Sequence, residues 1–143
     1  MITGIGHPCI RVRNFEASIK FYTEVLGLKL AFEIYKPDGV LGGVYLYIAP
    51  SQFIEIFPGG ENKCAITPET IGYLHICYEV SDIDSAYDEM RAKGAPIDVA
   101  LKDGISKCKM FFTHDPDGNI IEIMELVPGS LQAQANKKLE SQE

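Results

Sequence analysis

An internal repeat constrains the fold of this chain of 143 residues more than any other feature of its sequence. Residues of the same type recur at an offset of 67 or 68 positions. The repeated pairs are His7 and His75, Gly27 and Gly94, and Glu55 and Glu122. Two similar halves indicate duplication of one supersecondary unit. Because a unit of about 60 residues buries too little apolar surface to be stable alone, we expect the halves to pack on each other or on a second chain.

In the first half, apolar periodicity and turn residues predict the element order β-α-β-β-β. The predicted elements are a strand at 5–12, a helix at 14–26, and strands at 28–35, 43–49 and 52–57. Asn14 is the predicted N-cap of the helix, and Gly27 is predicted to end it in a left-handed conformation. The first half is therefore expected to be one βαβββ module over residues 1–58.

The second half repeats this order. The predicted elements are a strand at 72–80, a helix at 82–93, and strands at 97–101, 107–113 and 119–127. A linker is expected at 59–71, the second module at 72–128, and a polar tail at 129–143 that forms either a short surface helix or a disordered segment. The predicted fold is thus α+β, with two tandem βαβββ modules forming a curled mixed sheet and helices on its convex face.

Composition and charge exclude several classes of protein. A net charge of −7 and a pI near 4.9 argue against a nucleic-acid-binding or anionic-membrane-binding surface. No apolar run approaches the roughly 20 residues of a spanning helix, and the N-terminal residues lack the pattern of a secretory signal. The 4 cysteines form no C-x-x-C pair. We therefore expect a cytoplasmic protein with reduced thiols and no membrane or nucleic-acid partner.

A carboxylate lies in the middle of the last apolar strand of each half. Glu55 is centred in residues 53–57 and Glu122 in residues 120–124. An unpaired buried carboxylate costs several kcal/mol, so each glutamate is expected to have a partner. Because side chains alternate along strands, both glutamates and the two histidines, His7 and His75, are expected on the sheet face turned away from the helices. On a curled sheet that face lines a concave pocket.

Two imidazoles and two carboxylates form a suitable ligand set for a divalent transition metal ion. With one or two waters, this set fits six-coordinate Ni, Co, Mn or Fe, and Zn is a further candidate. Calcium and magnesium are disfavoured because histidine is a poor ligand for hard cations. The alternative is that the histidines act separately and each glutamate pairs with a lysine or arginine. The shared offset favours the metal site, with His7, Glu55, His75 and Glu122 as ligands.

Two sequence stretches show a family resemblance. Residues 21–28, Phe-Tyr-Thr-Glu-Val-Leu-Gly-Leu, and residues 115–122, Asp-Pro-Asp-Gly-Asn-Ile-Ile-Glu, resemble the end of the first helix and the final hairpin of the vicinal-oxygen-chelate superfamily. This superfamily includes glyoxalase, bleomycin resistance and dioxygenase proteins. The resemblance extends over about residues 5–127. Within the superfamily, the order His, Glu, His, Glu resembles the ligand set of glyoxalase I, or lactoylglutathione lyase.

The resemblance implies a metal-dependent isomerase that acts in methylglyoxal detoxification. Such an enzyme converts the hemithioacetal of a 2-oxoaldehyde and a thiol into a 2-hydroxyacyl thioester through a metal-stabilised enediolate. It implies Glu122 as the catalytic base, Glu55 as its catalytic counterpart, and Arg11 as a contact for the carboxylate of the thiol substrate. The short length resembles the bacterial form, which favours Ni or Co. The resemblance also implies a homodimer with a small-molecule substrate.

Three alternatives remain open at this point. The same ligand types serve acyl-thioester epimerases of the superfamily, and some members are non-catalytic small-molecule-binding proteins of the resistance type. Arg11 could equally form an ordinary ion pair at a strand end. The chain also has Gly59 where glyoxalase I usually carries asparagine, which leaves the identity of the thiol open.

Overall fold

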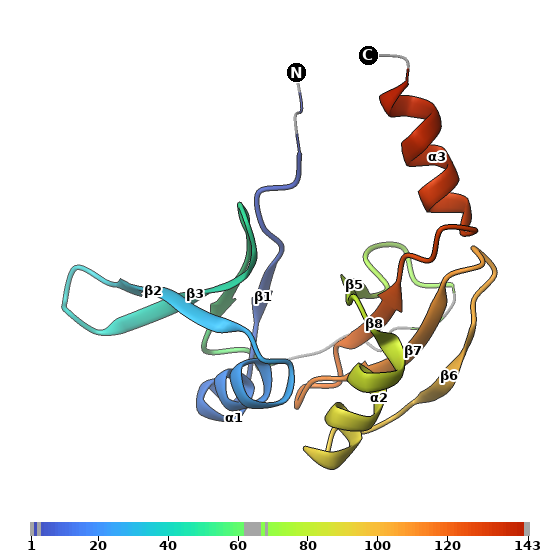
Figure 1. Cartoon of the computed structure of the whole chain (residues 1–143). Coiled ribbons are helices and arrows are strands. Elements are labelled where there is room, and N and C mark those ends of the chain that lie inside the picture. The colour runs from blue at the N-terminus through green and yellow to red at the C-terminus, as the bar shows by residue number, and fades with distance from the viewer. Residues whose placement is uncertain (1, 3, 62–66, 68, 142–143) are drawn as a thin grey trace. The chain divides into compact units, whose positions relative to one another are not determined.

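The structure is a computed structural model that describes residues 2, 4–61, 67 and 69–141. The chain divides into two compact units, Met1–Ala65 and Ile66–Glu143, which Figure 1 shows as ribbons. In the linker expected at 59–71, residues 62–66 and 68 lie outside the described residues.

The first unit is a four-stranded mixed sheet with one helical segment. Its elements are β1 (Cys9–Arg11), α1 (Phe15–Lys20), η1 (Phe21–Val25), β2 (Lys29–Tyr35), β3 (Leu41–Ala49) and β4 (Gln52–Phe57). The strand order across the sheet is β1-β4-β3-β2. β1 runs parallel to β4, whereas β4, β3 and β2 are antiparallel neighbours.

The second unit has the same architecture and an added C-terminal helix. Its elements are β5 (Ile76–Glu79), α2 (Ile83–Ala92), β6 (Val99–Asp103), β7 (Lys109–His114), β8 (Ile120–Glu125) and α3 (Leu131–Glu140). The sheet order is β5-β8-β7-β6, with β5 and β8 parallel. The α+β class and the two βαβββ modules are therefore confirmed, and their strands form two four-stranded mixed sheets, one in each unit.

The first helical segment begins and ends where the sequence predicts. The Asn14 side chain accepts a hydrogen bond from the Ala17 amide at 3.1 Å, and Gly27 has a φ of 74°. Its second half is a π-helical turn rather than regular α-helix. The Thr23 hydroxyl donates to the carbonyl of Ile19 at 2.8 Å. A side chain that bonds to a carbonyl of the preceding turn competes with the regular backbone ladder within this segment.

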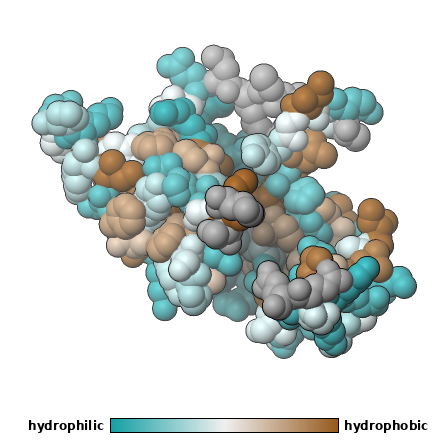
Figure 2. Space-filling view, turned by 90° about the horizontal axis from the view of Figure 1, so that it is seen from above, coloured by the Kyte–Doolittle hydropathy of each residue, from teal (hydrophilic) through white to brown (hydrophobic). Residues whose placement is uncertain are grey.

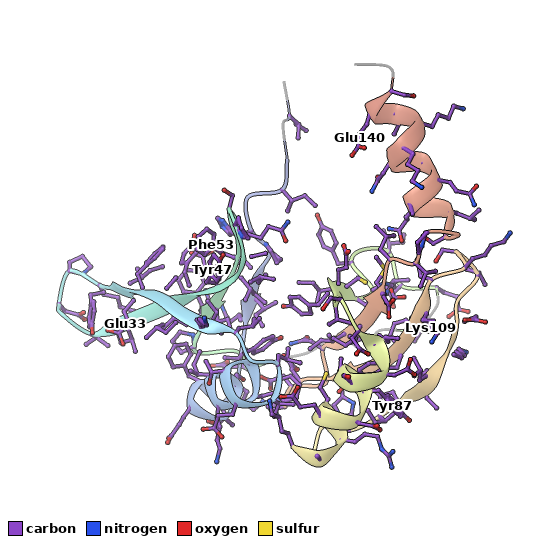
Figure 3. The ribbon with its side chains drawn as sticks, viewed as in Figure 1. Glu33, Tyr47, Phe53, Tyr87, Lys109 and Glu140 are labelled. Carbon is purple, nitrogen blue, oxygen red and sulfur yellow. The ribbon has the colours of Figure 1, made fainter. Side chains whose placement is uncertain are left out.

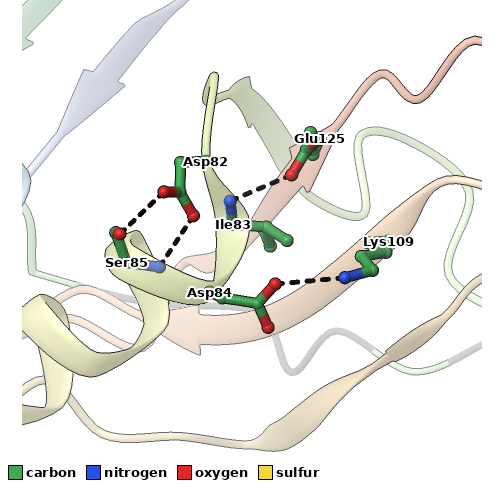
Figure 4. A network of polar contacts seen from close by, with 6 residues as sticks. All are labelled: Asp82, Ile83, Asp84, Ser85, Lys109 and Glu125. Carbon is green, nitrogen blue, oxygen red and sulfur yellow. Dashed lines mark hydrogen bonds and ion pairs between the residues drawn. The ribbon is translucent and has the colours of Figure 1, made fainter.

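Three polar contacts fix the N-terminus of α2, and Figure 4 shows them. They join Asp82 to Ser85, Ile83 to Glu125, and Asp84 to Lys109. The Asp82 carboxylate caps the helix by accepting from the amide and the hydroxyl of Ser85, and these bonds hold the pKa of Asp82 below its usual value. The other two contacts attach the helix to β8 and β7.

The polar tail forms a helix, α3, which agrees with the surface-helix alternative. Its N-cap is Ser130, whose hydroxyl accepts from the Ala133 amide at 3.2 Å. Along the described part of the chain, no helix combines the length and the apolar character that crossing a membrane requires.

Two strands begin four residues later than predicted. β1 begins at Cys9 rather than at residue 5, and β5 begins at Ile76 rather than at residue 72. Gly6 and Pro8 lie in the missing part of β1; glycine weakens a strand and proline cannot donate to a ladder. Both candidate histidines therefore lie just before their strands.

The predicted assignment of strand faces is confirmed in the two central strands β4 and β8. Their isoleucines Ile54, Ile56, Ile121 and Ile123 are buried. The glutamates between them are only half-buried, because they point to the opposite face. The isoleucines belong to the buried core, and their burial fixes the opposite direction for each glutamate.

Replacing Ile121 by valine is expected to lower the free energy of unfolding by about 0.5–1.5 kcal/mol, because it removes one buried methylene. The control is Ile120→Val, one residue away on the half-buried face, which should cost less than half as much. Urea denaturation measures both values. Equal losses would contradict the assignment of faces.

Candidate metal and substrate site

The first candidate pair joins His7, which precedes β1, to Glu55 in the middle of β4. His7 Nε2 lies 3.5 Å from Glu55 Oε2, and the two side chains are 38% and 14% exposed. The parallel pairing of β1 and β4 sets Cys9 beside Glu55. His7 lies two positions before Cys9, so its side chain reaches the same face of the sheet as Glu55.

The second candidate pair, His75 and Glu122, repeats this arrangement. His75 Nε2 lies 3.0 Å from Glu122 Oε2, with the side chains 38% and 18% exposed. Here Cys77 is the strand partner of Glu122. Within the part of the chain that the structure describes, no three His, Cys, Asp or Glu side chains form a group that could hold a metal ion. Each unit alone thus offers two of the four predicted ligands, and their convergence on one ion stays a prediction.

The spacing inside each pair fits two neighbouring ligands of one metal ion. Ligands at about 2.1 Å from a metal are about 3.0 Å apart at an octahedral angle and about 3.4 Å apart at a tetrahedral angle. The observed separations are 3.0 and 3.5 Å. One imidazole nitrogen and one carboxylate oxygen also suit the borderline divalent transition metals. Without an ion, the same two atoms make a polar histidine–carboxylate contact.

An aromatic side chain stands directly across from each glutamate. Tyr45 on β3 is the cross-strand partner of Glu55, and Phe112 on β7 is the partner of Glu122. The Tyr45 hydroxyl lies 3.2 Å from His7 Nε2. Neither aromatic residue was among the predicted site residues, although the two are 67 positions apart, the same offset as the glutamates.

Comparisons with known proteins show the family to which this chain is related. The family model described as the Glyoxalase/Bleomycin resistance protein/Dioxygenase superfamily matches residues 4–123, most of the chain. The chain belongs to this superfamily. The predicted family resemblance is thereby confirmed.

Several relatives in the glyoxalase superfamily are similar over most of this chain. The lactoylglutathione lyase of Schizosaccharomyces pombe is 30% identical over 84% of this chain, which spans only 46% of that protein. The lactoylglutathione lyase of Pseudomonas putida is 29% identical, with 86% of this chain and 85% of that protein covered. A glyoxalase family protein from Enterococcus faecalis is similar in structure, with a TM-score of 0.72 at 28% identity over 86% of this chain and 98% of its own.

The first unit of this superfamily member also carries an aromatic cluster around Tyr45. Phe32 stacks on Tyr45 with ring centroids 4.5 Å apart, and Tyr47 meets Phe53 edge-on at 5.8 Å. Figure 3 labels Tyr47 and Phe53, which lie side by side. Phe32 remains half exposed, and in Figure 2 apolar side chains of this unit lie beside a hydrophilic hairpin tip. The cluster gives this face an apolar wall next to the His7–Glu55 pair.

Arg11, which the resemblance assigns to substrate binding, is exposed on β1. Its Nη1 donates to the carbonyl oxygen of Pro58 at 2.7 Å, and its guanidinium lies 5.5 Å from the centre of the Phe57 ring. These contacts hold the guanidinium at the end of β4. Its role in substrate binding stays a prediction.

A cysteine is the strand partner of each glutamate, Cys9 of Glu55 and Cys77 of Glu122. Burial, a hydrogen bond with Glu55 and the charge of Glu55 raise the pKa of Cys9 to about 11. Burial and the charge and hydrogen bonding of Glu122 raise the pKa of Cys77 to about 12. At neutral pH both residues are therefore neutral thiols that can donate to the carboxylates. Cys64 lies outside the described residues.

In the metal-free protein, Cys9 and Cys77 are expected to exchange with a neutral aromatic disulfide such as dithiodipyridine at least about tenfold more slowly than free cysteine near pH 8. A higher pKa lowers the thiolate fraction, and the higher nucleophilicity of the remaining thiolate offsets only about half of this effect. The rate should rise with pH until the raised pKa is passed. Peptide mass mapping measures each site. A rate equal to that of free cysteine would contradict the contacts with the glutamates.

Proposed function

We propose that the protein is a divalent-metal-dependent isomerase of the glyoxalase I type. It converts the hemithioacetal of a 2-oxoaldehyde and a thiol into a 2-hydroxyacyl thioester. The observation that supports this most is the equivalent imidazole–carboxylate pair in each unit, with separations of 3.5 and 3.0 Å. The names of the two lactoylglutathione lyases that resemble this chain support the same reaction class.

In this proposal His7, Glu55, His75 and Glu122 hold one ion, with Ni or Co favoured over Zn, Mn or Fe. The two pairs come from one chain or from the two chains of a homodimer. When bound, the ion acts as a Lewis acid that stabilises negative charge on two adjacent substrate oxygens.

The chain's own residues move the proton and position the substrate. Glu122 accepts the proton from C1 of the hemithioacetal and returns it to C2, and Glu55 is its counterpart on the other side. Both carboxylates are half-buried beside apolar strand residues, which limits the access of water. Arg11 binds the carboxylate of the thiol, and the aromatic wall holds the apolar part of the substrate.

The test is an assay of the protein loaded in turn with Ni, Co and Zn, using methylglyoxal with glutathione and with other small thiols. We expect thioester formation that disappears on chelation and returns with added metal. Racemisation of a chiral acyl thioester without thioester formation would identify an epimerase instead. A protein that binds no metal and shows no turnover would instead be a non-catalytic binding protein. Either result would overturn the proposal.

A further inference from the structure

The two candidate pairs differ in one hydroxyl group. At equivalent strand positions, Tyr45 faces Glu55 and Phe112 faces Glu122. The phenol oxygen of Tyr45 lies 3.2 Å from His7 Nε2, on the strand position directly opposite Glu55. Burial and then hydrogen bonding with Glu55 raise the pKa of Tyr45. Phe112 contacts His75 edge-on, with ring centroids 5.5 Å apart, but it has no donor to offer. The repeat is therefore asymmetric at the point where the proposed chemistry takes place.

The ring of Tyr45 is held in place from two sides. Phe32 stacks on one side with an interplanar angle of 17°, and His7 meets the ring edge-on at 73°. A ring fixed in this way keeps its hydroxyl beside the first pair at little cost in entropy. If His7 Nε2 binds an ion, its lone pair is no longer an acceptor, and Glu55 remains as the acceptor for the Tyr45 hydroxyl.

We propose that Tyr45 is a positioning residue that makes the two carboxylates unequal, because its hydroxyl holds Glu55 as a metal ligand and leaves Glu122 to move the proton. This inference rests on the proposed function. A carboxylate that accepts from a phenol and a thiol has fewer free lone pairs and a fixed orientation. Glu122 has the thiol of Cys77 and a phenyl ring beside it, so no phenol hydroxyl fixes its orientation and it is freer to turn towards the substrate.

An exchange of the two aromatic residues tests this inference. Glu55→Gln and Glu122→Gln are each made in the wild type, in Tyr45→Phe, and in the double variant Tyr45→Phe with Phe112→Tyr. In the wild type, Glu122→Gln should lower kcat by about 100-fold or more, as expected for loss of a general base. Glu55→Gln should lower it about tenfold at saturating metal, as expected for a change in metal ligation. In the double variant the order of the two losses should reverse.

A second measurement does not depend on turnover. In the metal-free protein, Tyr45→Phe should shift the side-chain nitrogen resonances of His7 and leave those of His75 unchanged, and Phe112→Tyr should do the opposite. All three rings keep their size, so folding should be preserved. If the wild type forms thioester but the exchange leaves the order of the losses unchanged, the inference fails and the proposed function stands. If no thiol and metal give turnover, the proposed function fails and the inference fails with it.

Discussion

Replacing His75 by alanine should reduce the affinity for Ni or Co by more than 100-fold, and His7→Ala should have the same effect. Changes in outer-shell residues already cost roughly 10–100-fold in metal affinity, so loss of a direct ligand should cost more. The structure supports equal roles for the two histidines as ligands. In each unit, the imidazole nitrogen lies within 3.5 Å of a glutamate oxygen. Calorimetric titration of the metal-free protein measures the affinity.

The third histidine is a matched control for this experiment. His114 is 38% exposed, like the other two, and its Nδ1 lies 2.8 Å from Asp98. His114→Ala should therefore leave metal affinity within about twofold of the wild-type value. An equal loss in all three variants would indicate general destabilisation rather than ligation. A loss in only one of His7→Ala and His75→Ala would contradict a site built from both pairs.

Replacing Glu122 by glutamine should lower kcat by about 10²–10⁴-fold, equivalent to roughly 2.7–5.5 kcal/mol in the activation barrier. The amide keeps an oxygen that can approach the ion, so metal content should fall much less than turnover. Steady-state kinetics at saturating metal, with elemental analysis of the same sample, separates the two effects.

The neighbouring glutamate provides the control for this variant. Glu125, three positions further along β8, accepts from the Ile83 amide at 3.1 Å, and glutamine can still accept there. Glu125→Gln should keep turnover close to the wild-type value. Full activity in Glu122→Gln would remove Glu122 from the role of base.

The sequence predicts the fold well where periodicity reflects burial. The alternation around Glu55 and Glu122 assigns both faces correctly, because Ile54 and Ile121 are fully buried and the glutamates are not. Periodicity does not show where a strand stops pairing, so β1 and β5 are shorter than predicted. It also does not show the π-helical turn at Phe21–Val25, because the apolar spacing of the segment fits a regular helix as well.

For the candidate site, the repeat predicts each pair but not its neighbours. His7 meets Glu55 because parallel pairing of β1 and β4 follows from the βαβββ order. Tyr45 lies in an ordinary apolar strand pattern, and only its register opposite Glu55 makes it a neighbour of the site. The convergence of the two pairs on one ion stays a prediction, because sequence periodicity carries no signal for how two halves or two chains pack.

The most direct test of the central claim is the stoichiometry of metal binding. Metal-free protein is titrated with Ni²⁺ or Co²⁺, and bound metal is measured by elemental analysis after dialysis. If His7, Glu55, His75 and Glu122 form one site, within a chain or between two chains of a dimer, the protein binds one ion per chain. Two ions per chain, one on each pair, or no bound ion at all, would contradict the account.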